Sequence, residues 1–467
     1  MQPVSFLFKS ISKKKAGKPG AERIAPRRYS FDFTEIPRHV RRVVETLTGD
    51  GYDAYLVGGC VRDALLDLHP KDFDVATNAK PDEIKQLFGK RAAIIGRRFR
   101  IVHVRAGGQV VEVATFRGGE ERTEQRTEGG QIVTDNNFGA IHEDAVRRDL
   151  SINALFYDLA NGEVVDYVDG YKDIEQCRIR LIGDPLQRFR EDPVRMLRCV
   201  RFAAKLNTSL PPTLHQLIHR HAALLVNVSP SRMLGEFCKL NTHPSLERSI
   251  TLCRETGLLA ILFPGACQVL DSGGELARQG ESLIQAALRN TDTRLRTNGR
   301  VSQFYLLGVM LWPLMRELLS EDARINQFLL GKTAQRALRD VHCMKIPKNF
   351  SSRMINVWGL QLRLQYPQAR NLHWVLEHKD FRAAYDFLQL REGTGEVLGP
   401  RPSNWWGKIQ QADKSERQAM IDTLPRLAGR KNQRGLLLNR SLFDPELQEQ
   451  AQGKGHKREL NREPALV

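Results

Sequence analysis

The sequence has few cysteines and no pairs of them. Its seven cysteines are scattered, and none forms a CxxC pair or has the spacing of a zinc finger. An odd count without a regular framework is typical of reduced thiols. Secreted folds stapled by disulfides and structural zinc sites are therefore excluded, and we expect a cytoplasmic protein.

Long hydrophobic runs are also absent. No stretch of about 18 apolar residues occurs, so no transmembrane helix is expected. The apolar stretch near the start is too short for a signal peptide, and Lys13–Lys15 follow it instead of preceding it. The sequence contains no internal repeat, which disfavours a HEAT-like solenoid adaptor.

The chain has a large excess of basic over acidic residues. Its 467 residues include 71 Lys and Arg against 54 Asp and Glu, a formal net charge of +17. A positive surface attracts phosphate backbones, so a nucleic-acid partner is favoured over a basic surface that is merely solvated. Residues 430–467 contain eight Lys or Arg and five Asp or Glu, a net charge of only +3. Most of the excess therefore lies elsewhere, and we take Arg97, Arg98 and Arg100 as candidate RNA-binding residues.

The pattern of apolar residues predicts an α/β head followed by a long run of helices. Helices are expected at residues 33–47, 61–68 and 81–88, strands at 54–57, 71–78, 92–96, 100–106 and 109–116, and a hairpin at 155–168 that turns at Asn161–Gly162. After Asp184 the chain reads as helical almost to its end. We divide it into a basic flexible arm (1–30), a head (31–180), a helical neck (181–270), a helical body that binds RNA (271–411) and a mildly basic polar tail (412–467).

Two carboxylates stand close together in the second predicted strand. Asp72 and Asp74 are two residues apart, so they share one face of a strand while Phe73 points to the core. Carboxylates at this spacing can hold Mg²⁺, which prefers oxygen ligands and bridges substrate phosphates. Glu112, in another predicted strand, could reach the same face. Taken alone, such a pair is more often a charged strand edge.

The segment before this strand makes the metal interpretation the stronger one. Gly58 and Gly59 follow a predicted strand and lead into a helix with Arg62 and Asp63 in its first turn. Glycines here let backbone N–H groups approach phosphates, and Arg62 can neutralise them. Alone, this is a tight turn and a surface ion pair. Because Asp72 follows Asp63 by nine residues, the phosphate cradle and the carboxylates fall in one supersecondary unit.

Two further motifs carry polar residues at regular spacing. Arg148, Asp149 and Asn153 have helical spacing and could present donors and an acceptor to a ribose and a triphosphate, although an exposed face with ion pairs would look the same. Asp192 precedes a proline, as a helix N-cap does, and Arg195 can share a face with it. This carboxylate and guanidinium could read a base edge, and capping is the alternative role for Asp192.

These motifs resemble those of a known family. Residues 56–63 with Asp72 and Asp74 resemble the catalytic motif of the class II nucleotidyltransferases, which include tRNA CCA-adding enzymes and bacterial poly(A) polymerases. Residues 147–154 are similar to the family's ribose-contacting motif, and residues 191–198 to its base-recognition motif. The resemblance implies an α+β fold, with a polymerase-beta-like head built on a mixed sheet and an all-helical neck and body.

The resemblance extends to one branch of the family. Residues 94–104, 289–294, 378–388 and 405–407 are similar to bacterial poly(A) polymerases, although the dense basic tail of many members is missing. This implies an enzyme that adds AMP from ATP to RNA 3′ ends. The implied cofactor is Mg²⁺, as two ions, with Mn²⁺ as an alternative. Protein partners in RNA decay have no signature in the sequence.

The resemblance also assigns roles to the site residues. Asp72 and Asp74 would bind the metal ions, with Glu112 as a third catalytic carboxylate. The nucleotide would be bound by the residues of three motifs, Gly58, Gly59, Arg62, Arg148, Asp149, Asn153, Asp192 and Arg195. His103 is expected to be a packed core histidine. The alternatives are a CCA-adding tRNA nucleotidyltransferase and an RNA-binding protein with an inactive head.

Overall fold

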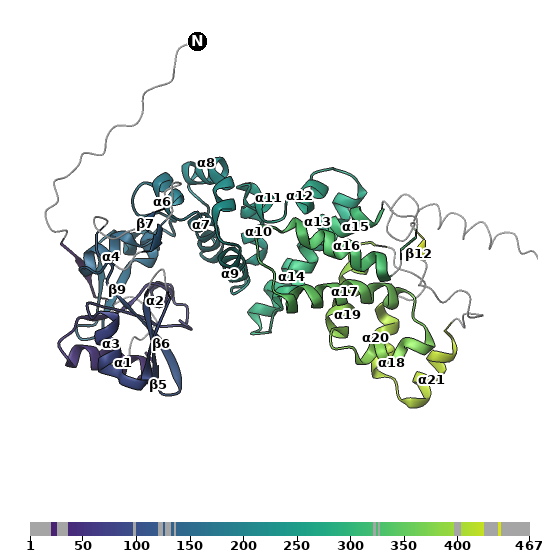
Figure 1. The fold of residues 1–467 in the computed structure, drawn as a ribbon, viewed down its shortest axis with the longest axis horizontal. Helices are drawn as coiled ribbons and strands as arrows, with labels where there is room; N and C mark the ends of the chain where they lie inside the picture. Colours follow the sequence, from purple (N-terminus) through teal and green to yellow (C-terminus); the bar gives the residue numbers. More distant parts are fainter. Residues whose placement is uncertain are drawn as a thin grey trace, which may run out of the picture. The chain divides into compact units, whose positions relative to one another are not determined.

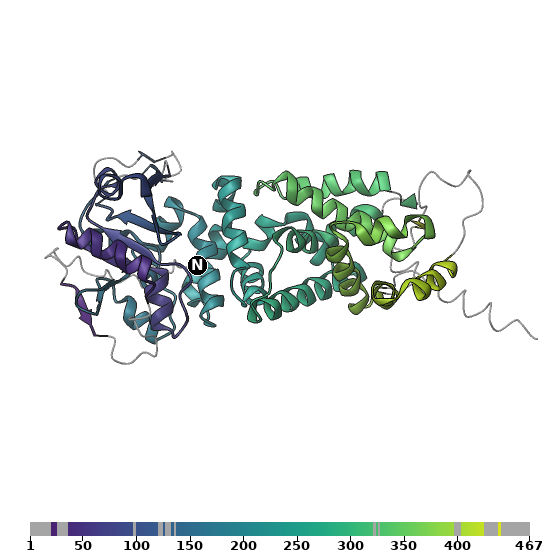
Figure 2. The same ribbon diagram turned by 90° about the horizontal axis from the view of Figure 1, so that it is seen from below.

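The computed structural model describes residues 20–25, 36–96, 100–119, 125–126, 132–134, 137–320, 324–325, 327–396, 403–424 and 438–439. The chain divides into two compact units, Met1–Asp192 and Pro193–Val467. The first contains a sheet, and the second is almost entirely helical (Figures 1 and 2). The boundary falls within residues 181–270, the stretch expected to be the neck.

A mixed sheet of eight strands forms the centre of the first unit. In spatial order the strands are β1 (Glu22–Ile24), β10 (Glu163–Asp166), β9 (Leu155–Asp158), β2 (Ala54–Val57), β3 (Asp74–Thr77), β6 (Gln109–Thr115), β5 (Ile101–Ala106) and β4 (Ala92–Ile95). β3 and β6 run parallel, and the other neighbouring strands of this sheet are antiparallel. A separate short ladder pairs β7 (Gln125–Arg126) with β8 (Ile132–Thr134).

The described residues of the first unit include six α-helices, and the first three of them contact strands of the sheet. They are α1 (Arg38–Gly49), α2 (Gly59–Leu65), α3 (Pro81–Phe88), α4 (Ile141–Arg147), α5 (Gly170–Glu175) and α6 (Pro185–Glu191). The buried residues of α1 are Val40, Val43, Val44 and Leu47, which recur at helical spacing and form the face that packs on the sheet.

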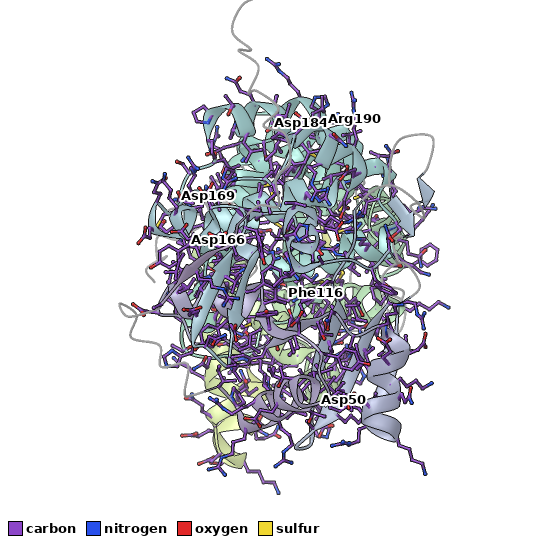
Figure 3. All side chains as sticks on the ribbon, turned by 90° about the vertical axis from the view of Figure 1, so that its left-hand side faces the viewer. Asp50, Phe116, Asp166, Asp169, Asp184 and Arg190 are labelled. Atoms are coloured by element: carbon purple, nitrogen blue, oxygen red, sulfur yellow. The ribbon has the colours of Figure 1, made fainter. Side chains whose placement is uncertain are left out.

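An aromatic cluster lies within the first unit. Phe116 and Phe156 are fully buried, and their rings meet edge to face at 6.3 Å. In Figure 3, Phe116 lies between Asp184 on the upper side and Asp50 on the lower side. Val57, the last residue of β2, belongs to the same buried cluster as Phe116 and Phe156.

The second unit consists of packed helices. They are α7 (Val194–Lys205), α8 (Pro212–His221), α9 (Pro230–Leu240), α10 (Leu246–Glu255), α11 (Leu258–Leu262), α12 (Pro264–Leu270), α13 (Glu275–Arg296), α14 (Gln303–Met310), α15 (Trp312–Ser320), α16 (Gln327–Asp340), α17 (Lys348–Gln365), α18 (Ala369–Glu377), α19 (Phe381–Gly393), α20 (Ser403–Gln411) and α21 (Lys414–Asp422), with one short ladder of β11 (Arg324–Ile325) and β12 (Leu438–Asn439). Trp312, Trp358 and Trp406 are fully buried among them. No helix within the described ranges is both long enough and apolar enough to cross a membrane.

The structure confirms the predicted α+β class and corrects several boundaries. Within the expected arm (1–30), Glu22–Ile24 form a strand that pairs with β10. The strand expected at 71–78 begins only at Asp74. The helix expected from 61 begins at Gly59. Residues 1–19 of the arm and most of the tail beyond 424 lie outside the described residues.

Candidate active site

The glycine turn lies at the end of a central strand. β2 ends at Val57, and Gly58 follows with φ = 76°, a conformation that favours glycine. A Cβ atom on Gly58 would lie 3.4 Å from Arg148 Nη1 and 3.6 Å from the backbone oxygen of Asn153. The turn is thus directly beside two residues of the predicted ribose motif. Gly59 begins α2 at the same point.

Asp74 occupies the position between this turn and Glu112. In the sheet, Asp74 pairs with Val57 on β2 and with Glu112 on β6. Paired residues of neighbouring strands project to the same face, so the sheet places the two carboxylates side by side. Asp72 is exposed and precedes the strand, so it shares no strand face with Asp74, contrary to the prediction. Phe73 is half-buried instead of in the core.

The other two carboxylates act electrostatically on Asp74. Burial raises the pKa of Asp74 to about 6, Glu112 and Asp72 add to the increase, and Arg148 opposes it. Uncompensated negative charge of this kind favours a bound cation, and its donors are oxygens, which suit Mg²⁺. No three His, Cys, Asp or Glu side chains in the described part of the chain gather as a complete metal site. In proteins Mg²⁺ is usually held by one or two carboxylates together with substrate phosphates and water.

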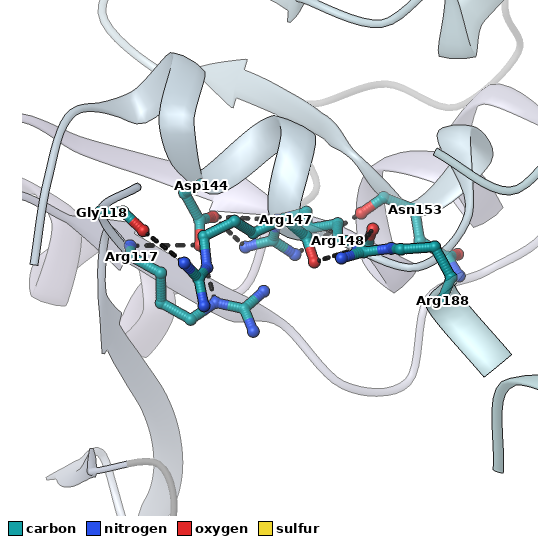
Figure 4. A network of polar contacts seen from close by, with 7 residues as sticks. All are labelled: Arg117, Gly118, Asp144, Arg147, Arg148, Asn153 and Arg188. Carbon is teal, nitrogen blue, oxygen red and sulfur yellow. Dashed lines mark hydrogen bonds and ion pairs between the residues drawn. The ribbon is translucent and has the colours of Figure 1, made fainter. Parts of the chain in front are cut away.

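Asp144 fixes Arg148, whose positive charge lowers the pKa of Asp74, within the network of polar contacts shown in Figure 4. Asp144, on α4, is 2% exposed and accepts hydrogen bonds from Arg148 Nε at 2.9 Å and Nη2 at 2.7 Å. It also accepts from Arg117 Nε at 3.1 Å. Burial alone would raise the pKa of Asp144, but the two guanidinium groups hold it below its ordinary value. The Arg148 guanidinium lies 5.1 Å above the ring of Phe156, so it is held from two sides.

A second set of contacts ties α6 to this cluster. Arg188 Nη2 donates to the backbone oxygens of Arg147 at 2.6 Å and Arg148 at 2.5 Å, and Arg147 Nη1 donates to the oxygen of Gly118 at 2.8 Å. Sequence reasoning missed Asp144, Arg117 and Arg188. Only Asp144 had a local signal, because it lies four residues before Arg148 on one helix face.

The predicted ribose motif does not form one helix. α4 ends at Arg147, and Ser151–Asn153 form a separate 3₁₀ turn, η3, so Arg148, Asp149 and Asn153 do not share a helical face. Arg148 and Asn153 still converge beside Gly58, and Asp149 is half-buried. Buried Nδ2 of Asn153 has no hydrogen-bond partner among the described residues.

Arg62 is a buried residue, not half of a surface pair. It is 4% exposed, and its guanidinium donates to Asp63 Oδ1 at 2.7 Å and to Asn153 Oδ1 at 2.5 Å. An arginine that is already held on two sides positions its neighbours. In this arrangement Arg62 orients Asn153 through its Oδ1, while Nδ2 of Asn153 stays buried without a partner among the described residues.

The predicted base-reading residues stand at the boundary of the two units. Asp192 ends α6, where its backbone N donates to Arg188 O at 3.1 Å, and α7 begins after Pro193 without a side-chain cap. Asp192 is thus the C-cap of α6 and Pro193 is the N-cap of α7, which does not favour the alternative role of Asp192 as an N-cap. Asp184 is the side-chain N-cap of α6 and accepts from Gln187 N at 2.8 Å. Arg195 is buried in the first turn of α7.

The sequence also led to expectations for His103 and for three arginines near it. His103 is a half-exposed residue whose Nε2 lies 3.2 Å from Glu112 Oε1, so it is not a packed core histidine. Arg100 pairs with Asp82 at 3.1 Å. Arg97 and Arg98 lie outside the described residues, so their RNA-binding role stays a prediction.

A glycine turn beside carboxylates on a mixed sheet, with a fixed guanidinium facing them, defines the first unit as a nucleotidyltransferase head. Models for the poly A polymerase head domain, the probable RNA and SrmB-binding site of polymerase A and the polymerase A arginine-rich C-terminus match residues 54–180, 209–270 and 332–436. Poly(A) polymerase I of Salmonella typhimurium is 39% identical over 416 residues, covering 86% of this chain and 88% of that protein. The chain belongs to the bacterial poly(A) polymerase I family, within the wider tRNA nucleotidyltransferase family.

Other comparisons agree with this assignment. Poly(A) polymerase I of Haemophilus influenzae is 35% identical, covering 85% of this chain and 90% of that protein. A CCA-adding enzyme of Geobacillus is 38% identical, but the match covers only 55% of this chain and 59% of that enzyme. The solved structure of an apo CCA-adding enzyme matches with a TM-score of 0.55 at 17% sequence identity, and the match covers 89% of this chain and 94% of that enzyme. A tRNA nucleotidyltransferase solved with a primer tRNA and an ATP analogue matches with a TM-score of 0.51 at 21% sequence identity, and the match covers 75% of this chain and 96% of that enzyme. These structures confirm the fold.

Proposed function

We propose that this protein adds AMP from ATP to RNA 3′ ends without a template and releases pyrophosphate. The observation that carries this function is the position of Asp74, between the strand that leads into the Gly58 turn and Glu112 on β6. Relatives named poly(A) polymerase I match most of the chain, which supports the same activity. The reaction needs no covalent enzyme intermediate, because alignment and charge neutralisation suffice.

Asp72 and Asp74 would hold Mg²⁺, and Glu112 would be the third catalytic carboxylate. A bound metal pair would supply charge neutralisation for the triphosphate and activation of the attacking 3′ hydroxyl. Asp74 is the fixed member of the set, because the sheet holds its backbone between β2 and β6. Asp72 and Glu112 are exposed, so substrate can reach them from solvent.

The remaining residues would position the nucleotide. Backbone N–H groups at Gly58 and Gly59 would contact the phosphates, and Arg148 would supply a positive charge whose position is set before ATP arrives. Asn153 and Asp149 would contact the ribose, with Arg62 holding Asn153 in place. These roles are supported by the position of Arg148 and Asn153 beside Gly58, which brings the ribose motif next to the glycine turn.

Asp192 and Arg195 would select adenine. Adenine offers an exocyclic amine donor beside a ring acceptor, which a carboxylate and a guanidinium can pair. Cytosine offers a similar pattern on a smaller ring. A site that fits a purine would leave cytosine loosely held and its α-phosphate misaligned, which lowers the rate.

The selection model predicts the result of an assay with a tRNA that ends at its discriminator base. The wild-type protein should extend this tRNA with ATP and add little from CTP. Arg195→Ala should lower ATP activity and the preference for ATP together, whereas Lys205→Ala, at the other end of α7, should change neither. Efficient CTP addition that stops after CCA would assign the protein to the CCA-adding branch. The absence of any ATP turnover would favour the RNA-binding protein with an inactive head.

The raised pKa of Asp74 predicts how activity depends on pH. Metal binding needs the deprotonated carboxylate, so at low Mg²⁺ the rate should fall as the pH decreases through about 6. Mg²⁺ competes with the proton, so saturating Mg²⁺ should move this decrease to lower pH. Initial rates of AMP addition, measured on both sides of pH 6 at a low and a saturating Mg²⁺ concentration, test this dependence. If the midpoint pH of the decrease were the same at both Mg²⁺ concentrations, a group other than Asp74 would control the rate.

A further inference from the structure

The second unit contains a groove outside the candidate active site. Its volume is about 700 Å³, and residues of α13, α14, α17 and α19 line it. These helices pack against one another, α13 on α14 and α19, and α17 on α14 and α19 (Figure 1). Residues 289–294 and 378–388, two segments similar to poly(A) polymerases that the active site does not use, both contribute to the lining.

The lining is strongly positive. It contains five cationic side chains and one carboxylate, a difference of four charges: Arg294, Arg300, Arg353, Lys379 and Arg382 against Asp386. The single carboxylate already has two partners, Arg294 Nη2 at 2.9 Å and Arg382 Nε at 3.0 Å. It therefore cannot neutralise the rest of the groove. Positive charge concentrated in a concave surface attracts a polyanion more than the same charge spread over a convex one.

One of the cations is fixed in advance. The Arg353 guanidinium lies 4.0 Å from the centre of the Phe304 ring and donates from Nε to Asp380 Oδ1 at 2.6 Å. Asp380 is fully buried and also accepts from Asn356 Nδ2 at 2.9 Å. A guanidinium held by a ring and a buried carboxylate loses little conformational entropy when it binds a phosphate.

Two other cations have no partner. Arg300 and Lys379 are exposed, and neither makes an ion pair or a hydrogen bond with any residue that the structure describes. They come from different parts of the chain. Arg300 lies in the segment between α13 and α14, and Lys379 lies two residues before the start of α19. Their meeting at one groove brings unneutralised charge next to the prepositioned Arg353.

We propose that this groove binds the single-stranded RNA upstream of the 3′ end, through contacts of Arg300, Lys379 and Arg353 with successive phosphates. The proposal rests on the proposed function, since an enzyme that extends RNA must hold the strand that it extends. Single-stranded RNA suits this lining because guanidinium planes and the Tyr305 ring offer stacking surfaces for bases of any sequence. The ligand chemistry is shared with free ATP, which also carries phosphates and a purine.

The test compares two charge-reversal variants of the full chain. Arg300→Glu/Lys379→Glu changes the groove, and Lys332→Glu/Lys408→Glu changes two exposed lysines outside its lining. Binding of a labelled 20-nucleotide oligoadenylate is measured by fluorescence anisotropy over a series of salt concentrations. The groove variant should bind at least ~10-fold more weakly, and the slope of log K against log salt should become shallower by about 1.4, for two lost phosphate contacts. The control variant should stay within about 2-fold of wild type.

Two further measurements separate the groove from the chemistry. The rate of a single AMP addition at saturating RNA, and KM for ATP, should be unchanged in the groove variant, with an unchanged melting temperature. Equilibrium dialysis should give the same number of ATP sites as wild type. Loss of one ATP site would identify the groove as a nucleotide site and overturn the proposal. Equal weakening in both variants, or oligoadenylate binding by the groove variant within 2-fold of wild type, would overturn it too.

Discussion

Asp74→Asn should lower the rate of AMP addition by at least ~10²-fold while RNA affinity stays within a few-fold of wild type. Asp74 is the carboxylate that the sheet holds between the glycine turn and Glu112, so an isosteric amide removes the ligand without moving the backbone. Asp72→Asn should have a similar effect. Single-turnover rates with saturating RNA and ATP, alongside anisotropy with labelled RNA, measure the two quantities.

The same substitution should leave the protein as stable as wild type or more so. Folding raises the pKa of Asp74 to about 6, so the folded protein binds a proton more tightly than the unfolded chain does, and without Mg²⁺ it loses stability as the pH rises through about 6. A shift of this size corresponds to at most ~3 kcal/mol at neutral pH. Asp74→Asn removes that loss, and a thermal melt in chelator measures it. Asp50→Asn, at the end of α1, is the control and should change neither rate nor stability. An Asp74→Asn protein that adds AMP within a few-fold of wild type would rule out the metal assignment.

Asp144→Asn should lower kcat by roughly 10- to 100-fold and raise KM for ATP, although Asp144 itself contacts no substrate in the proposed mechanism. Its carboxylate holds Arg148 through two hydrogen bonds and Arg117 through a third, so its loss frees the guanidinium that faces Asp74 and the glycine turn. Breaking a buried ion pair also destabilises a protein by about 3–5 kcal/mol. Rates should therefore be measured well below the melting temperature.

The control for this substitution is a buried carboxylate in the second unit. Glu396 is 5% exposed and lies between Arg391, at 2.7 Å, and Arg316, at 3.8 Å. Glu396→Gln should lower the melting temperature as Asp144→Asn does but leave kcat unchanged on a short primer. If both variants lost stability alike and Asp144→Asn kept its rate, Asp144 would have only a structural role.

The central strands, and the places of Asp74 and Glu112 in them, were predictable because each depends on a local pattern. Alternation along β6 placed Glu112 opposite the buried Val111 and Val113, and the order of strand, glycine turn and carboxylates put Asp74 near Gly58. What the sequence could not supply was the register between β3 and β6, which joins residues 38 positions apart, Asp74 and Glu112. It is set by packing across the whole sheet.

Where the structure differs from the pattern of the sequence, the difference has an identifiable physical cause. Residues 147–154 have helical spacing, but Leu150 forms a bridge with Leu181, and Ile182 N donates to Asp149 O at 3.0 Å, so pairing with a distant segment replaces the helix. Asp192 precedes a proline, as many N-cap residues do, yet it is the C-cap of α6, and Pro193 is the N-cap of α7. The partnership of Asp144 with Arg117 spans 27 residues, which no local periodicity reveals.

The most direct test of the account is incubation of the pure protein with an arbitrary RNA, Mg²⁺ and one nucleoside triphosphate at a time. Products are resolved by length and digested to determine the added base. We expect long homopolymers of A with ATP, formed on any accessible 3′ end, and little extension with CTP, GTP or UTP. Extension with CTP as efficient as with ATP, or no extension with ATP by a folded protein, would contradict it.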